Sequence, residues 1–234
     1  MTYDVGEGVL KKMLELKDIP STDEIHFSIT VGESSNLYFY RHSTNAVTVI
    51  PGPKPEPGHP EPSPDPPFKF VISPNIWAGG LSAPLAIVIH TAAGSLAGMD
   101  SWFANPASQV SAHFAVGLTG HVHQYVDLAN AAWANGIVEA GSKWPAIGGT
   151  TNPNRQCIAI ETEDLKNPAQ PVTDTQYQSV LWACRQALLP YPGIKYLLGH
   201  KDISPASRPN CPGNRWIASG CFAQLAAELG LQTV

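Results

Sequence analysis

The sequence has 234 residues, of which 43% are apolar and 14% charged, and its formal net charge is −5. This length can bury a substantial core, either as one large domain or as a main domain with an appendage. The sequence has no cluster of Lys and Arg that would neutralise phosphates and no run near the roughly 20 apolar residues of a membrane helix, so binding to nucleic acid and insertion into a membrane are not expected.

The first part of the chain differs in composition from the rest. Residues 1–67 carry five Lys/Arg and ten Asp/Glu, whereas residues 68–234 carry nine of each. Residues 51–67, PGPKPEPGHPEPSPDPP, contain nine prolines in seventeen positions, which favours an extended polyproline II spacer. We therefore expect a small N-terminal α+β module at residues 1–50, a proline-rich linker at 51–67 and the main domain at 68–234.

Within the N-terminal module, residues 8–18 show helical spacing of apolar positions, and residues 24–31, 36–42 and 46–50 are typical of strands. About fifty residues make a marginal core, so we expect the module to pack on the main domain or on a partner. The N-terminal residues MTYDVGEGVLKKMLELKD are too polar for a signal peptide, which predicts a protein kept in the cytoplasm of the producing cell until it is released.

The main domain alternates strand-like and helix-like segments. Strands are predicted at 68–72, 84–90, 112–118, 121–127, 157–163 and 193–200, and helices at 95–105, from Thr173 to Pro190, and at 220–230. The segments 112–118 and 121–127 form a predicted hairpin around Thr-Gly. Strands mixed with flanking helices indicate an α/β (α+β) fold with one central mixed β-sheet.

The four cysteines, at 157, 184, 211 and 221, form no C-x-x-C pair, which excludes a zinc ribbon. Cys157 lies in an apolar strand and Cys184 in an amphipathic helix, so we interpret both as buried reduced thiols.

His90 and His200 occupy matching positions, because each ends an apolar strand and precedes a turn. If the two strands are neighbours, the imidazoles converge at one sheet edge, and Cys211, at the end of a proline-rich loop, could complete a set of three ligands. Three protein ligands and an open position are typical of catalytic zinc. The alternative, two hydrogen-bonded histidines and a buried thiol, stays open on spacing alone.

Six short blocks then carry a family resemblance over about 160 residues. They are SPNIW at 73–77, IVIHTAAG at 87–94, SAHFAVGLTGHVHQYV at 111–126, AWANG at 132–136, IAIETE at 158–163 and GHKDISPASRPNCPG at 199–213. In this order they resemble the zinc-dependent N-acetylmuramoyl-L-alanine amidases of type 2, which share a fold with the peptidoglycan recognition proteins.

The resemblance implies roles for single residues. His90, His200 and Cys211 would bind Zn²⁺, and Glu161 would be the general base, with Glu163 a weaker candidate on the same strand face. A zinc-bound water has its pKa lowered to about 7, which supplies the nucleophile for amide hydrolysis. Trp133, His113 and Asn135 are the candidate substrate-binding residues, with His113 expected near the metal and His121 and His123 on the hairpin surface.

Two departures from the family pattern concern catalysis. Members usually have a lysine two residues before the third ligand, where this chain has Pro209, and Arg208 is the candidate replacement for stabilising the oxyanion. Some relatives have a tyrosine where this chain has Ala112, which shifts catalysis onto Glu161.

The predicted function is hydrolysis of the amide between N-acetylmuramic acid and the L-alanine of the peptidoglycan stem, by a monomeric enzyme that lyses the bacterial cell wall as phage endolysins do. A bacterial recycling or autolytic amidase is a nearby alternative. A non-catalytic peptidoglycan-binding protein and a peptidase with Cys211 as nucleophile are alternatives from other classes.

Overall fold

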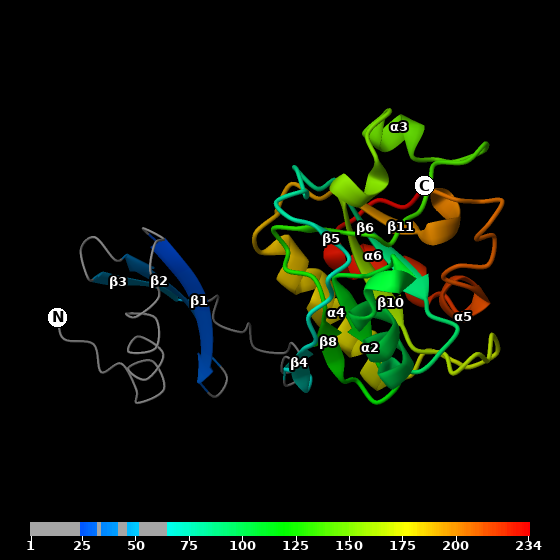
Figure 1. The fold of residues 1–234 in the computed structure, drawn as a ribbon. Helices are drawn as coiled ribbons and strands as arrows, with labels where there is room; N and C mark the ends of the chain where they lie inside the picture. The colour runs from blue at the N-terminus through cyan, green and yellow to red at the C-terminus, as the bar shows by residue number, and fades with distance from the viewer. Residues whose placement is uncertain (1–23, 32–33, 42–45, 52–64) are drawn as a thin grey trace. The chain divides into compact units, whose positions relative to one another are not determined.

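The computed structural model describes residues 24–31, 34–41, 46–51 and 65–234. The chain separates into two compact units, Met1–Pro64 and Asp65–Val234 (Figure 1). The last three residues of the predicted spacer belong to the second unit, where Trp182 Nε1 donates a 2.8 Å hydrogen bond to Asp65. The helix predicted at 8–18 and residues 52–64 of the spacer lie outside the described residues.

The first unit contains a three-stranded antiparallel sheet in the order β1-β2-β3. Its strands are β1 (Glu24–Val31), β2 (Ser34–Arg41) and β3 (Ala46–Pro51), within two residues of the predicted bounds.

The second unit is built on a six-stranded sheet in the order β11-β6-β10-β7-β8-β4. Its strands are β4 (Phe68–Phe70), β6 (Ala86–Thr91), β7 (Phe114–Val116), β8 (Val122–Gln124), β10 (Cys157–Thr162) and β11 (Tyr196–Gly199). The four strands from β11 to β7 run parallel, and β8 is antiparallel to β7. The predicted central mixed sheet is therefore confirmed. A separate two-stranded sheet pairs β5 (Ile76–Trp77) with β9 (Ala131–Ala132).

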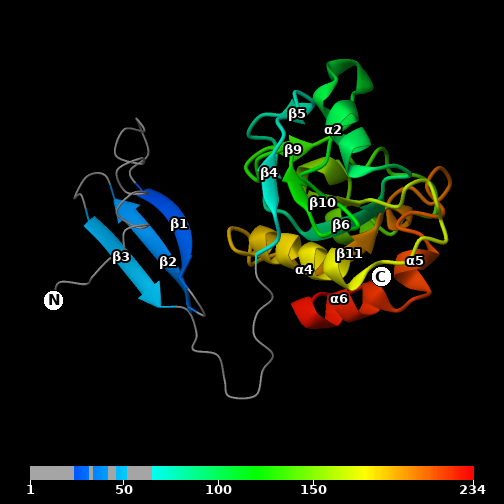
Figure 2. The ribbon, with the colours of Figure 1, turned by 90° about the horizontal axis from the view of Figure 1, so that it is seen from below.

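Helices cover both faces of the large sheet (Figure 2). The α-helices are α2 (Leu96–Ala104), α3 (Pro145–Gly148), α4 (Asp174–Leu188), α5 (Asn214–Ile217) and α6 (Cys221–Leu229), and the 3-10 helices are η1 (Pro106–Ser108), η2 (Pro153–Arg155) and η3 (His200–Asp202). None of the helices among the described residues is long and apolar enough to cross a membrane.

The alternation of side chains along β6 and β10 decides which residues face which helices. Ile87, Ile89, Ile158 and Ile160 pack with α4 and α6 in one core cluster. The alternate positions of these strands face the opposite side, where Ala159 packs with residues of α2. Because side chains alternate with period two, His90 and Glu161 project on this second side, at the carboxyl ends of their strands.

Thr173 caps α4 by accepting a hydrogen bond from Gln176 N, and the Gln176 side chain donates to Val116 O and Glu163 O. One local prediction needs correction. His123 is not a free surface residue of the β7–β8 hairpin, since its Nδ1 lies 2.7 Å from Asp100 Oδ1. His121 is exposed, as predicted.

Candidate active site

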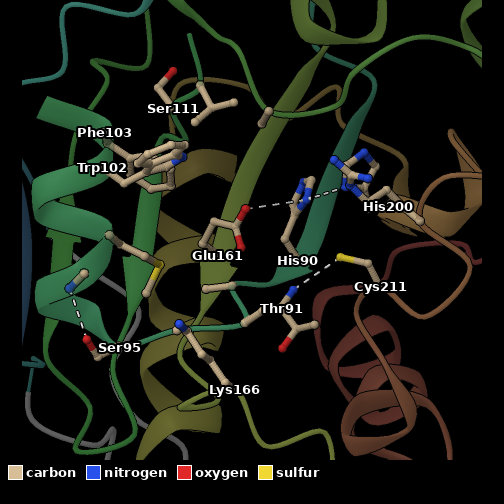
Figure 3. A pocket seen from close by; sticks show the side chains of 18 of the residues that line it. His90, Thr91, Ser95, Trp102, Phe103, Ser111, Glu161, Lys166, His200 and Cys211 are labelled. Atoms are coloured by element: carbon tan, nitrogen blue, oxygen red, sulfur yellow. Dashed lines mark hydrogen bonds and ion pairs between the residues drawn. The ribbon is translucent and has the colours of Figure 1, made fainter. Parts of the chain in front are cut away.

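His90, His200 and Cys211 converge at the carboxyl ends of β6 and β11. The two strands pair in parallel with Gly199 opposite Ile89, so His200, the next residue, comes beside His90. Their Nδ1 atoms lie 3.0 Å apart, and the ligand atoms of the three residues all lie within 4.8 Å of one another (Figure 3). All three side chains are buried, so the structure brings together three residues able to bind one metal ion.

Asn135 determines which ring nitrogens face this centre. Its backbone carbonyl lies 3.2 Å from His200 Nε2 and can only accept, so His200 carries its proton on Nε2. Its side-chain Oδ1 lies 3.2 Å from His90 Nε2 and orients that ring in the same way. Both Nδ1 lone pairs therefore point into the space between the two rings.

This arrangement fits a cation. Two lone pairs at 3.0 Å repel each other unless a proton or a metal ion lies between them. Protonation is disfavoured, because burial and then the neighbouring His200 hold the pKa of His90 well below its usual value, and burial lowers the pKa of His200 to about 4. Two imidazoles and a thiol are a donor set suited to zinc.

The surroundings of Cys211 bear on the alternative in which it is a nucleophile. Its Sγ accepts a 3.3 Å hydrogen bond from Thr91 N, and burial, followed by the Glu161 carboxylate, raises its pKa to about 12. A nucleophilic cysteine needs a thiolate activated by a base within hydrogen-bond reach, and the base is missing from the hydrogen bonds of the described residues. The geometry therefore opposes the cysteine-peptidase alternative.

Glu161 lies beside the cluster. It is the register partner of His90 across β10 and β6, and its Oε1 is 3.8 Å from His90 Nδ1. Its Oε2 is buried without a hydrogen-bond partner. Burial and the nearby Asp164 raise the pKa of Glu161 to about 8, against the opposing effect of Arg208. A partly buried carboxyl group with a raised pKa and a free oxygen is suited to accept and return a proton.

Glu163, the weaker candidate for the base, is used structurally. Its two carboxylate oxygens accept hydrogen bonds from Leu96 N at 3.0 Å and Leu118 N at 2.8 Å. It thus joins the start of α2 to the β7–β8 hairpin, and both oxygens are engaged away from the histidines.

A groove of about 600 Å³ opens onto the cluster and continues the site along α2. Its walls are largely apolar, and they include Met99, Phe103, Val110 and the 55% exposed Trp102. A second cavity of about 520 Å³ shares Trp133, His200 and Arg208 with the groove. The cluster therefore adjoins two hollows that could each hold part of a large substrate.

Arg208, the candidate for stabilising the oxyanion, lines both hollows beside the three-residue cluster. Its Nη1 donates to the carbonyl of neighbouring Ser207, and the guanidinium is otherwise exposed. The loop that carries it is fixed by Glu139, whose Oε2 accepts hydrogen bonds from Ala206 N and Ser207 N.

The three predicted substrate-binding residues differ in placement. Trp133 lines both hollows. His113 is fully buried and lines neither hollow, with Nδ1 accepting from Ala159 N and Nε2 facing Asn130 O, so these contacts hold it in the fold. The side chain of Asn135 is only 1% exposed, lies against His90 and also lines neither hollow.

Several residues that shape the site were not predicted from the sequence. Asn154 fixes the Asn135 backbone by accepting hydrogen bonds from Ala134 N and Asn135 N. Trp102 and Lys166 line the groove. Trp102 could have been found as an aromatic within the helix that follows the His90 strand, whereas Asn154 is an isolated amide in a loop and carries no sequence signal.

The comparisons with known proteins agree with this geometry. The model of the family described as N-acetylmuramoyl-L-alanine amidase matches residues 80–214, which include the three-residue cluster and Glu161. N-acetylmuramoyl-L-alanine amidase A of Achromobacter lyticus is 45% identical over 49 residues, which are 20% of this chain and 28% of that protein. The 1,6-anhydro-N-acetylmuramyl-L-alanine amidase AmpD of Haemophilus influenzae is 33% identical over 99 residues, 42% of this chain and 49% of that protein.

These matches therefore span less than half of either curated relative. Among solved structures, the crystal structure of a selenomethionine AmpD derivative is similar with a TM-score of 0.54 and 25% identity, covering 68% of this chain and 93% of that chain.

Proposed function

The chain belongs to the N-acetylmuramoyl-L-alanine amidase family, and from this premise we propose that it is a zinc-dependent hydrolase of the amide between N-acetylmuramic acid and the L-alanine of the peptidoglycan stem peptide. The observation that carries the proposal is the position of Glu161, in register with His90 and beside the His90, His200 and Cys211 cluster at the end of a groove.

The proposed zinc ligands are His90 Nδ1, His200 Nδ1 and Cys211 Sγ. When bound, zinc would supply Lewis-acid activation of a water molecule and of the amide carbonyl. The chain itself orients the ligands, since Asn135 directs both imidazoles and Thr91 N donates to the cysteine sulfur. Such outer contacts raise ligand basicity and fix ring orientation.

Glu161 would move the proton. Its carboxylate takes a proton from the attacking water and returns it to the nitrogen of the leaving L-alanine, so that the amide C–N bond breaks with a neutral amine as product. Burial raises its pKa to about 8, and a cation beside it would lower that pKa again and restore the carboxylate that a base requires.

Arg208 would stabilise the negative charge that develops on the carbonyl oxygen. It lies in the wall of the groove at the cluster, and its guanidinium is free of carboxylate partners within residues 65–234. The groove along α2 and the adjoining cavity provide room for the peptide and sugar parts of the substrate on a continuous surface.

The physiological substrate that we propose is polymeric peptidoglycan, with lysis of the bacterial cell wall as the outcome and with storage in the cytoplasm before release. A soluble 1,6-anhydromuramyl peptide, the substrate in the name of the Haemophilus influenzae relative, is the alternative form of the same bond. Both contain the amide that the proposed chemistry cleaves.

The test uses the full chain on purified peptidoglycan and, separately, on a 1,6-anhydromuramyl peptide. We expect new L-alanine amino termini, detected by mass spectrometry, that disappear with a chelator and return with zinc. Glu161→Gln should remove them, whereas Glu228→Gln, on the opposite side of the sheet in α6, should not. Binding to peptidoglycan without new termini, in the zinc-loaded protein, would support the non-catalytic alternative and reject the proposed function.

A further inference from the structure

The groove contains a lysine, Lys166, whose ammonium group has no carboxylate partner among residues 65–234. Lys166 lines the groove together with Arg208, and Glu161 is the only carboxylate among the lining residues. Within residues 65–234, no carboxylate lies within salt-bridge distance of the Lys166 ammonium group. In Figure 3 the Lys166 side chain points into the groove, on the side of Thr91 and Ser95.

The backbone around Lys166 is held in an unfavourable conformation. Leu165 and Lys166 are consecutive non-glycine residues with φ of 55° and 62°, in the left-handed region. Non-glycine residues rarely adopt this conformation and keep it only where neighbouring groups enforce it, which is a common property of ligand-binding segments.

The group that enforces this conformation is Asp164. This residue is 4% exposed, and its Oδ1 accepts hydrogen bonds from Lys166 N at 3.0 Å and Gly94 N at 2.9 Å. Its Oδ2 accepts from Thr91 Oγ1 at 2.9 Å. Because both oxygens are occupied, Asp164 positions the backbone of Lys166 against the loop that follows β6 and leaves the ammonium group for another anion.

Lys166 and Arg208 occupy different parts of the site. Arg208 lines both hollows, whereas Lys166 lines only the groove along α2. Lys166 would therefore meet a part of the substrate that lies in the groove alone.

We infer that Lys166 is a specificity-determining residue that binds a carboxylate of the stem peptide beyond L-alanine. The inference rests on the proposed function and adds a preference for acidic over amidated stem peptides. Apart from Lys166 and Arg208, the groove offers no cation, so one carboxylate on a peptide in the groove meets one free ammonium group.

The experiment compares two synthetic substrates in which the γ-carboxyl group is blocked, N-acetylmuramoyl-L-alanyl-D-glutamate γ-methylamide with a free α-carboxylate and the same compound with an α-amide. For the zinc-loaded full chain we expect kcat/KM about five- to tenfold higher on the acid, mainly through KM, because one charge-assisted hydrogen bond is gained at a partly exposed site. The preference should shrink as salt is raised.

Lys166→Met should remove the preference by lowering kcat/KM on the acid and leaving the amide unchanged, and Lys166→Glu should invert it. Lys195→Met, which changes an exposed lysine outside both hollows, should keep the preference. Thermal unfolding of each variant shows whether the 164–166 loop is intact, and the acid-to-amide ratio within one variant is independent of the amount of folded enzyme.

Equal cleavage of acid and amide by the wild type would overturn the inference and leave the proposed function standing. A preference that survives Lys166→Met would also overturn it. Cleavage of neither compound, nor of peptidoglycan, would reject the proposed function and the inference with it.

Discussion

Glu161 and His90 are register partners on adjacent parallel strands, with Oε1 3.8 Å from Nδ1. This pairing places the proposed base beside the proposed metal ligand through backbone hydrogen bonding of β10 and β6, two adjacent inner strands of the sheet. Rigid strands hold such a constellation better than loops do. The distance between Glu161 and His90 is therefore a property of the sheet itself.

Glu161→Gln tests the role of this carboxylate. The amide has nearly the same shape but cannot take a proton from water, so we expect kcat to fall by about 10²- to 10⁴-fold while zinc content stays at one ion per chain. Turnover is measured by release of L-alanine amino termini and zinc by atomic absorption. A Gln variant with wild-type kcat would place the base elsewhere.

Cys211→Ser tests the metal centre. The hydroxyl is a poorer ligand for zinc than a thiolate, so we expect the dissociation constant for zinc to rise by at least tenfold and the rise of Tm on adding zinc to shrink. The control is Cys221→Ser, which changes a half-buried cysteine at the start of α6. If Cys211→Ser and the wild type bind zinc equally, Cys211 is not a ligand.

The sequence predicted the elements that carry strong periodicity and the three residues that the structure brings together as a possible metal site. His90 lies near the end of β6 and His200 directly follows β11, and the parallel pairing of these strands brings the two residues together as strand-end spacing suggested. The burial of His113 and Asn135 was not predicted, because a family block shows that a position lies near the site but not which way its side chain points. Their orientation depends on contacts to Ala159 and His90 from segments distant in the sequence.

Asn135→Ala tests whether this residue orients the ligands. Removing Oδ1 frees His90 Nε2 but leaves the backbone carbonyl that accepts from His200. We expect zinc affinity to fall by about 10- to 100-fold, as is typical when a contact behind a metal-bound histidine is lost. Asn135→Asp, which keeps an acceptor, should lose less, and the exposed Asn167→Ala should lose nothing. Equal zinc affinity of Asn135→Ala and the wild type would contradict an orienting role.

Trp102→Ala tests the apolar wall of the groove. Trp102 is 55% exposed on α2, so its removal should change Tm little. Loss of an aromatic surface that contacts substrate should raise KM by about tenfold with kcat nearly unchanged. Leu189→Ala, an exposed apolar residue outside the groove, is the control. An unchanged KM would mean that the substrate does not reach the α2 wall.

His113 should make the stability of the fold depend on pH. Burial lowers its pKa to about 4 in the folded protein, against 6.5 for the ordinary side chain, although Asn130 O and Asp127 oppose the shift. Between these two values the unfolded chain binds a proton that the folded protein does not, so stability is full above pH 6.5 and falls as the pH drops toward 4. The complete effect is about 3 kcal/mol.

His113→Gln removes this titration. In urea denaturation of the metal-free protein between pH 4.5 and 7.5, the variant should be less stable at pH 7.5, because the contacts to Ala159 N and Asn130 O are disturbed, but should lose less stability on acidification. Titration of His90 and His200 contributes equally to the pH dependence of stability in the wild type and in the variant. The difference in slope between the two proteins therefore belongs to residue 113. His121→Gln, at the exposed hairpin position, should keep the wild-type slope. Parallel curves for His113→Gln and wild type would show that His113 binds its proton equally in the folded and unfolded states. That result would contradict a folded His113 whose Nδ1 is held unprotonated by the hydrogen bond from Ala159 N.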